Sequence, residues 1–410
     1  MSLGIDPGRL RSDMLELARI GTIEGRPGIN RPSFSEADMA GRRFFMERCR
    51  AVGLATRMDA VGNVVARWEA GSGAAVMAGS HLDTVPEGGV FDGTLGACAA
   101  LEAVRVMRAA GMAPARPIEV VATADEEGRF GGMLGSQALA GLVDPAWLAA
   151  ATDDRGVLLV DAMRAQGLDP ERHAEAARDP KDLHAFLELH IEQGPVLEAA
   201  GLEIGIATGV SGVFNWTVTF EGVANHSGTT PMNLRRDAFR GLAAFAGRID
   251  AIIEKLGSDQ ARLTIGKVEL LPNFPHTIPG RATFSIIGRD TRAEVMDEMA
   301  ALCRLELDAA ARIHGLGLAI REESRLEPVA LAPDLLTLLE GCSRGLGHAT
   351  TTLPSGAGHD AQTMAHVTRT GLIFVPSKGG ISHAPEEDTD WADVERGANV
   401  LLHGLLALTT

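Results

Sequence analysis

Cysteine is scarce in this sequence and follows no recognisable spacing. The 410 residues contain four cysteines, at positions 49, 98, 303 and 342. None of them forms the close pairs that are typical of a disulfide framework or of a cysteine-based zinc site. We therefore expect reduced thiols, and any metal site must use other ligands.

Positive charge and long apolar runs are also lacking. Lysine and arginine number 38 against 54 aspartates and glutamates, which gives a formal net charge of −16. Such a chain is a poor partner for nucleic acid or an anionic membrane, because binding phosphates requires clustered basic residues. No apolar run reaches about 18 residues, and no basic segment precedes an apolar core at the N-terminus. These absences favour a cytoplasmic protein whose partner is a small molecule.

The composition and the alternation of elements are typical of an α/β protein. With 45% hydrophobic and 22% charged residues, the chain can build two domains with full cores. A helical pattern covers about residues 13–53, and short apolar strands follow, among them Ile118–Thr123 and residues 184–191. The alanine-rich segment 96–110 has few polar positions, which indicates a helix buried on a sheet.

The pattern changes near residue 210 and changes back near residue 327. Between these points we expect a strand at 216–221, a long helix at 234–256, strands at 263–270 and 282–288, a helix at 292–314 and a strand at 317–323. This β-α-β-β-α-β order is typical of a ferredoxin-like sandwich. The sequence therefore predicts a discontinuous first domain, residues 1–210 and 328–410, and an inserted domain, residues 211–327.

Histidines and acidic residues stand at the ends of apolar runs or in glycine-rich loops. Imidazole and carboxylate are ligands that zinc and manganese take, and the carboxyl ends of strands are where α/β sheets place ligand sites. A two-metal site also needs a carboxylate that bridges the ions. We predict that Asp92 is this bridge, with His81 and His190 on one ion and Glu127 and His383 on the other.

Two further acidic residues fit roles beside these ligands. Glu126 precedes Glu127, and we predict that it takes a proton from the attacking water and passes it to the leaving nitrogen. Asp83 follows His81 by two residues and could hold its imidazole in the metal-binding tautomer. Taken alone, each histidine would more often be a core or surface residue, and a Glu-Glu pair is usually solvated. The convergence of all these motifs favours the metal site.

With these residues in place, the chain resembles the hydantoinase/carbamoylase-type amidohydrolases. They are a branch of the dinuclear zinc aminopeptidase-like superfamily that includes N-carbamoyl-L-amino acid hydrolases, allantoate amidohydrolases and ureidopropionases. The segments His-Ile-Glu-Gln-Gly-Pro at 190–195 and Ser-Gly-Ala-Gly-His-Asp-Ala at 355–361 separate this branch from aminoacylases and dipeptidases. The other matching segments are 79–86, 90–96, 125–132, 225–232 and 374–387.

The resemblance implies a zinc-aminopeptidase-like catalytic domain with a ferredoxin-like insertion that serves as a dimerisation and lid domain. It implies the metal ligands and the base named above, two divalent ions per subunit (zinc, or manganese, cobalt or nickel) and a homodimer. His226 would stabilise the oxyanion, within one chain or across the dimer. Gln193 would contact the substrate amide, and Arg289 would anchor its carboxylate. The alternatives are a turn-capping His226 and a surface charge at Arg289.

Two departures from the family pattern bear on the substrate. His276 stands where the family usually has asparagine, and Phe214 and Asn215 occupy a segment that usually contains arginine. We therefore count His276, Phe214 and Asn215 as candidate substrate contacts in an altered pocket. His359 belongs to the family signature, but five ligands already fill two sites, so we expect it to support its loop.

These observations predict a cytoplasmic, homodimeric, metal-dependent amidohydrolase that cleaves a linear amide or ureido C–N bond. The expected substrate is an N-carbamoyl-L-amino acid or a related ureido acid, with release of ammonia and carbon dioxide. Allantoate hydrolysis and aminoacylase- or dipeptidase-like hydrolysis of N-acyl amino acids are the enzymatic alternatives. A binding protein without turnover would predict a damaged base or metal ligand, and the sequence shows neither.

Overall fold

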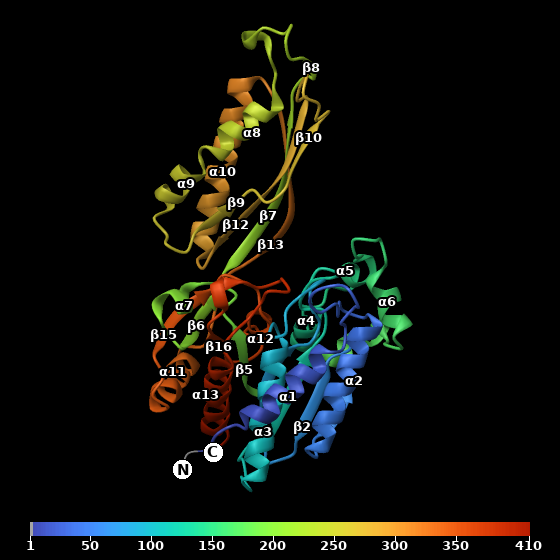
Figure 1. Cartoon of the computed structure of the whole chain (residues 1–410), viewed down its shortest axis with the longest axis vertical. Coiled ribbons are helices and arrows are strands. Elements are labelled where there is room, and N and C mark those ends of the chain that lie inside the picture. The colour runs from blue at the N-terminus through green and yellow to red at the C-terminus, as the bar shows by residue number, and fades with distance from the viewer. Residues whose placement is uncertain (1–2) are drawn as a thin grey trace. The chain divides into compact units, whose positions relative to one another are not determined.

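The chain forms two compact units in the computed structural model, which describes residues 3–410 (Figure 1). The first unit comprises the chain up to Thr208 together with Leu331–Thr410, and the second is Gly209–Ala330. The second unit is therefore inserted in the sequence of the first. Among residues 3–410, no helix is long and apolar enough to span a lipid bilayer.

A mixed sheet of nine strands is the centre of the first unit. Its four central strands run parallel in the order β4 (Ile118–Thr123), β3 (Ala75–His81), β5 (Leu183–Ile191) and β16 (Thr370–Val375). Antiparallel pairs extend the sheet on both sides. They add β2 (Val64–Trp68) and β1 (Ala55–Met58) beyond β4, and β6 (Ile204–Val210) and β14 (Val329–Ala330) beyond β16. Strand β15 (Thr350–Ser355) also pairs with β6.

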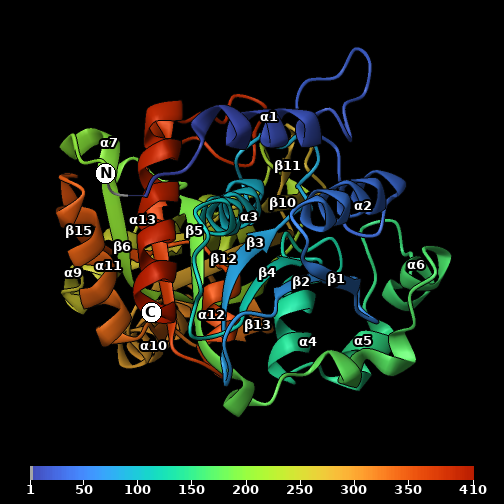
Figure 2. The ribbon, with the colours of Figure 1, turned by 90° about the horizontal axis from the view of Figure 1, so that it is seen from below.

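Helix α3 (Thr94–Ala109) packs on this sheet with α13 (Trp391–Thr409) and α1 (Pro7–Ala18) beside it (Figure 2). Ala97, Ala99, Ala100 and Ala103 of this helix are fully buried, and their small side chains let the helix approach the strands closely. Gly96 marks the closest approach, since a Cβ there would lie 2.4 Å from the Leu189 carbonyl oxygen of β5. Buried alanine and glycine thus hold the start of α3 against the strands that carry the site residues.

The segment before α2 (Glu36–Ala51) differs from the prediction of one helical stretch over residues 13–53. Residues 19–35 form no helix, because Gly21, Gly25 and Gly28 have positive φ angles of 102°, 76° and 68° that a helix does not allow. Ser35 then begins α2, with its side chain accepting a hydrogen bond from the Asp38 amide at 3.1 Å.

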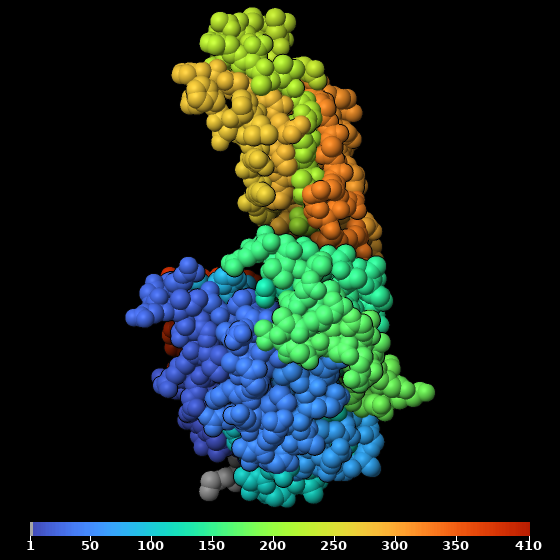
Figure 3. All heavy atoms as spheres, turned by 90° about the vertical axis from the view of Figure 1, so that its right-hand side faces the viewer, coloured from blue at the N-terminus to red at the C-terminus, as the bar shows by residue number. Residues whose placement is uncertain are grey.

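The first unit has several further helices, most of them short. Figure 3 shows the N-terminal segments (blue) beside the segment of α5 and α6 (green), and Arg129 joins them through hydrogen bonds to the Ser33 carbonyl at 2.6 Å and to Asp153 at 3.0 Å. The helices are α4 (Leu134–Ala140), α5 (Pro145–Ala150), α6 (Leu159–Ala165), α7 (Val196–Ala200), α11 (Pro333–Gly345), α12 (Asp360–Met364) and 3-10 turns at Pro170–Ala176, Pro180–Asp182 and Lys378–Gly380.

The second unit has an antiparallel sheet in the order β10 (Val268–Leu271), β12 (Arg281–Asp290), β7 (Gly212–Glu221) and β13 (Gly317–Leu326). A core that includes Phe220, Phe245 and Phe284 lies between the sheet and the helices α8 (Ala238–Ala246), α9 (Ile249–Leu256) and α10 (Ala293–His314). The smaller elements are β9 (Arg262–Thr264), which pairs with β12, the β8 (Asn225–His226) and β11 (Thr277–Ile278) pair, and a 3-10 turn at Met232–Leu234.

Glycine divides two elements that the sequence predicted as continuous. The helix expected at 234–256 is split at Gly247 and Arg248 into α8 and α9. The strand expected at 263–270 is two short strands on either side of Gly266. Glycine has weak helix and strand preference, so it is a natural place for the chain to change direction.

Candidate metal centre

The parallel strands of the first unit end at one edge of the sheet, and the predicted site residues lie there. His81 is the last residue of β3, and His190 is the penultimate residue of β5. Glu126 and Glu127 follow β4, and His383 lies in the loop after β16. The carboxyl edge of parallel strands thus brings together residues that are far apart in the sequence.

Three buried residues form a first potential metal-binding cluster, which we call the His81 group: His81, Asp92 and His190. The Nε2 atoms of both histidines lie 3.2 Å from Asp92 Oδ1. Their Nδ1–H groups donate to backbone carbonyls, of Asp83 for His81 at 3.0 Å and of Ile191 for His190 at 2.9 Å. These bonds place the ring hydrogen on Nδ1 and leave Nε2 of each ring as an acceptor beside Asp92, as metal ligation requires. Nε2 of His190 also accepts from the Gly93 amide at 3.2 Å.

A second cluster uses the other carboxylate oxygen of Asp92, and we call it the His383 group: Asp92, Glu127 and His383. His383 Nε2 lies 3.5 Å from Asp92 Oδ2 and 3.2 Å from Glu127 Oε2. The side chain of Glu127 is 6% exposed, whereas that of His383 is 52% exposed. Asp92 therefore presents one oxygen to each group, which is the arrangement of a bridging carboxylate.

The donors of both groups fit divalent cations. Burial raises the pKa of Glu127 to about 8, with a further increase from Asp92. Within residues 3–410, its buried Oε1 atom has no hydrogen-bond partner. Burying several carboxylates together without compensation is costly, and a divalent ion provides that compensation. Nitrogen and oxygen donors without thiolate suit zinc and manganese.

Glu126 lies on the His81 side of the centre. Its Oε2 is 3.5 Å from His81 Nε2, and its side chain is 9% exposed. Burial raises the pKa of Glu126 well above its usual value, with His81 opposing this shift and Glu127 adding to it. A carboxylate with a raised pKa is suited to accept and return a proton near neutral pH.

Asp83 makes different contacts from those predicted. Its backbone carbonyl, rather than its carboxylate, accepts the His81 Nδ1–H, and the carboxylate lies 4.0 Å from that nitrogen. The carboxylate instead accepts hydrogen bonds from Ser33 at 2.8 Å and from the amides of Glu127 at 3.1 Å and Glu126 at 3.4 Å. Asp83 therefore holds the backbone of the two glutamates.

Glu387, which is not among the residues predicted from sequence, fixes the turn that carries Asp92. Its Oε1 accepts from the amides of Phe91 at 3.0 Å and Asp92 at 3.1 Å. Its Oε2 accepts from Ser382 at 3.1 Å, and the Ser382 hydroxyl also lies 3.0 Å from Asp92 Oδ2. A Cβ at Gly89 would lie 2.2 Å from Glu387, so glycine provides the space for this side chain.

Buried polar residues also pack around His190 and the strand that carries it. His359 is 1% exposed, its ring centroid lies 4.6 Å from that of His190, and its Nε2 is 2.8 Å from the Ser355 hydroxyl. Burial lowers the pKa of His359 well below its usual value. Glu188 accepts from Ser80 at 2.6 Å and from the Ala361 amide at 2.8 Å. These contacts join the 355–361 signature to the ligand strands.

Comparison with known proteins identifies the family. The model of peptidase family M20/M25/M40 matches residues 77–407. The chain belongs to peptidase family M20/M25/M40. This M20 protein is 37% identical to an N-carbamoyl-L-amino-acid amidohydrolase of Paenarthrobacter aurescens, covering 98% of this chain and 97% of the relative. It is 38% identical to an allantoate amidohydrolase of Escherichia coli K12, covering 91% of each.

Solved structures give the same result for this M20 protein. A hydantoinase/carbamoylase family amidase of Burkholderia multivorans matches with a TM-score of 0.91 and 33% identity, over 100% of this chain and 99% of the other. The resemblance predicted from the sequence motifs is therefore confirmed. The M20 family is metal-dependent, which agrees with the two clusters around Asp92.

Gln193 contacts the centre through its amide nitrogen. Nε2 donates to Asp92 Oδ2 at 2.7 Å and lies 3.1 Å from the Ser382 hydroxyl. Its Oε1 is buried and has no hydrogen-bond partner within residues 3–410. Gln193 itself has a positive φ of 56°, so the backbone is held in an unfavourable region to place this side chain.

Four residues of the second unit were predicted to contact the substrate or the oxyanion. Two of them lie in one loop cluster, and the other two lie on one face of the sheet. His226 pairs with Thr277 between β8 and β11, and the carbonyl of His276 accepts from the Ser227 amide at 3.0 Å, so both histidines belong to one loop cluster. Nδ1 of the exposed His226 accepts from the amides of Gly228 and Thr229 at 3.0 and 3.2 Å. Asn215 and the half-buried Arg289 lie on the sheet face opposite the helices.

Phe214 corrects a sequence-based expectation. Its side chain is 1% exposed and its ring centroid lies 4.8 Å from that of Trp216. A Cβ at Gly288 would lie 2.3 Å from the Phe214 ring. Because β7 alternates between its two faces, Phe214 points under the helices while Asn215 points away from them. Phe214 is a core residue.

Proposed function

We propose that this M20 protein is a metal-dependent amidohydrolase that cleaves a linear amide or ureido C–N bond. The proposed substrate is an N-carbamoyl-L-amino acid or a related ureido acid, which would yield ammonia and carbon dioxide. The observation that carries this proposal is the carboxylate of Asp92, whose two oxygens face two separate donor clusters beside a buried Glu126. The relatives named for N-carbamoyl-L-amino acid and allantoate hydrolysis support the bond type.

We propose that His81, Asp92 and His190 hold one divalent ion and that Asp92, Glu127 and His383 hold the other. Zinc or manganese, or cobalt or nickel, would polarise the substrate carbonyl and lower the pKa of a water. Glu126 accepts the proton of the attacking water and returns it to the departing nitrogen, for which its buried position 3.5 Å from His81 Nε2 is suited. Asp83 keeps Glu126 in place through the backbone.

Substrate contacts are proposed on both units. Gln193, whose Oε1 has no hydrogen-bond partner within residues 3–410, is proposed to contact the substrate amide. On the second unit, Arg289 is proposed to bind the substrate carboxylate, with Asn215 on the same sheet face. His226 is proposed to donate to the oxyanion, within one chain or across a dimer, and His276 shares its loop cluster.

We also propose that residues 1–210 and 328–410 are the catalytic domain of a cytoplasmic enzyme and that residues 211–327 are a ferredoxin-like dimerisation and lid domain. The sheet order β13-β7-β12-β10 with helices on one face supports this topology. Its edge strands β10 and β13 offer a place where a second copy can pair, because edge strands carry backbone groups suited to strand addition. Size-exclusion chromatography with light scattering tests the homodimer.

Ammonia release tests the proposed activity. Purified protein loaded with zinc or manganese is assayed with N-carbamoyl-L-amino acids, N-carbamoyl-β-alanine, allantoate and N-acyl amino acids. We expect ammonia from a ureido substrate and at least about a thousandfold loss in Glu126→Gln with retained metal. Turnover of N-acyl compounds alone would identify an aminoacylase-like enzyme. Binding without any turnover would contradict the proposal.

A further inference from the structure

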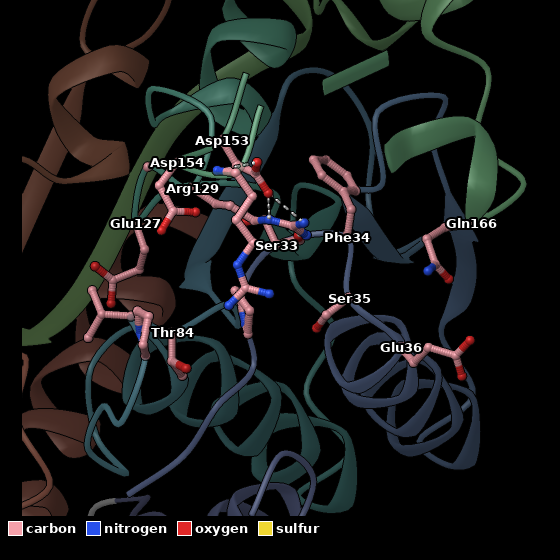
Figure 4. A pocket seen from close by; sticks show the side chains of 15 residues that line it. Ser33, Phe34, Ser35, Glu36, Thr84, Glu127, Arg129, Asp153, Asp154 and Gln166 are labelled. Atoms are coloured by element: carbon pink, nitrogen blue, oxygen red, sulfur yellow. Dashed lines mark hydrogen bonds and ion pairs between the residues drawn. The ribbon is translucent and has the colours of Figure 1, made fainter. Parts of the chain in front are cut away.

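A cavity of about 630 Å³ opens beside the His383 group (Figure 4). Its walls come from segments 32–36, 84–86, 127–129 and 153–155 and from Gln166. All of these residues belong to the first unit, so the second unit is not needed to form it. Figure 4 shows Glu127 at one end of the lining residues and Gln166 at the other.

The cavity adjoins the reacting centre through two of its walls. Glu127 lines the cavity and is also a member of the His383 group. The wall at 84–86 directly follows Asp83, whose carbonyl orients His81. A substrate whose scissile bond lies beside Asp92 therefore has room to extend past Glu127 into this space.

Part of the lining is apolar. Pro32, Phe34, Val85 and Pro86 contribute hydrophobic side chains. Phe34 is 3% exposed, and its ring centroid lies 6.1 Å from that of Phe130, so it supports the wall from behind, while the half-buried Val85 and the exposed Pro86 present apolar surface. Ligand pockets with mostly hydrophobic walls and a volume of roughly 300–1,000 Å³ are suited to small organic groups.

The charged groups of the lining do not form an anion site. Arg129 donates to Asp153 at 3.0 Å and to the Ser33 carbonyl at 2.6 Å, and its guanidinium lies 4.7 Å from the Phe130 ring centroid. Its donors are thus directed at protein partners. The other charged side chains, apart from Glu127, are the exposed acids Glu36 and Asp154 and the exposed Arg155, so negative charges outnumber positive ones.

We propose that this cavity receives the side chain of the substrate and selects for an uncharged aromatic or branched aliphatic one. This inference rests on the proposed amidohydrolase function and narrows its substrate class. It favours N-carbamoyl derivatives of phenylalanine or leucine over N-carbamoyl-β-alanine, which has no side chain to bury. It also disfavours allantoate, because its second ureido group would lose hydrogen bonds to water against the apolar wall.

The test compares kcat/KM for N-carbamoyl-L-phenylalanine with that for N-carbamoylglycine. In the wild-type protein we expect this ratio to be about tenfold or more. Val85→Trp fills the cavity and should lower the ratio by about tenfold or more. Leu142→Trp, at a residue 50% exposed outside the cavity, adds the same side chain and serves as the matched control. A wild-type ratio near one, or a ratio unaffected by Val85→Trp, would overturn the proposal.

A second variant covers loss of folding in Val85→Trp. Val85→Ala widens the cavity and should raise the preference for N-carbamoyl-L-tryptophan over N-carbamoyl-L-leucine several-fold, whereas an unchanged preference contradicts the cavity assignment. Calorimetric binding of N-carbamoyl-L-phenylalanine to metal-loaded Glu126→Gln separates the two proposals. Binding that Val85→Trp weakens, without wild-type turnover, supports the cavity and contradicts the amidohydrolase function. Turnover without a side-chain preference would support the amidohydrolase function and contradict the cavity assignment. If the protein shows no binding and no turnover, both proposals are rejected.

Discussion

The His81 group and the His383 group share Asp92 but differ in how the protein holds their ligands. The side chains of His81 and His190 are each 2% exposed, and a backbone carbonyl fixes each ring through Nδ1. The side chain of His383 is 52% exposed and stands at a residue with a positive φ of 56°. The histidines of the first group stand on strands, whereas the second group takes its histidine from a loop. We expect tighter metal binding in the His81 group.

Removing Asp92, the ligand that both groups share, should have the largest effect, because it weakens both metal sites at once. Asp92→Ala takes one donor from each group, so we expect both ions to be lost and activity to fall by about a thousandfold or more. Metal content by mass spectrometry and ammonia release measure the effect. A variant that keeps two ions would show that Asp92 is not the bridge.

Removing one histidine from each group should expose the difference between them. His383→Ala should retain one tightly bound ion, whereas the ion that remains in His190→Ala should bind at least about tenfold more weakly. Competition with a fluorescent zinc chelator measures both dissociation constants. Equal dissociation constants in the two variants would contradict the expectation that the His81 group binds metal more tightly than the His383 group.

Glu387 offers a way to weaken the hydrogen bonds that support Asp92 and the loop next to His383. Glu387→Gln disturbs the bonds to the Phe91 and Asp92 amides and to Ser382, so we expect the weaker ion to lose about 10- to 100-fold in affinity. Glu386→Gln, at the exposed neighbouring residue, changes the charge equally and is the control. Similar losses in both variants would point to net charge rather than to the hydrogen bonds.

The pH dependence of metal binding should give the smallest effect. Burial and Asp92 raise the pKa of Glu127 to about 8, so without metal its contribution to stability is present below its unfolded pKa of about 4.5 and is lost as pH rises through about 8. A cation replaces that proton, and its apparent affinity for the His383 group should rise by up to about tenfold per pH unit towards pH 8. Calorimetric titrations from pH 6 to 9 measure it. In Glu127→Gln the part of the pH dependence of metal affinity that comes from this carboxyl should disappear. If the affinity of this variant changes with pH as steeply as that of wild type, another group causes the pH dependence.

The sequence predicted which ligands meet, because their motifs stand at the ends of strands that must be parallel neighbours. The family and its mixed α/β sheet are confirmed, while the roles of His81, Asp92, Glu127, His190 and His383 stay predictions that the observed clusters support. Helix 234–256 was wrong as a single element, because a glycine inside a helical pattern does not reveal from sequence whether the chain bends.

The supporting residues were harder to find. Glu387 acts on a turn almost 300 positions earlier, and only the folded sheet brings the two loops together. Asp83 was assigned by its spacing from His81, yet the end of β3 turns its carbonyl rather than its carboxylate to the ring. Phe214 could have been assigned correctly, since Phe214, Trp216, Val218 and Phe220 alternate as one buried strand face.

The occupancy and positions of bound metal test the account most directly. Crystals grown with manganese or zinc should give two anomalous-scattering peaks on either side of the Asp92 carboxylate. One peak should lie beside His81 and His190, and the other, with lower occupancy under limiting metal, beside Glu127 and His383. A single ion, or an ion away from Asp92, would contradict the two-group centre.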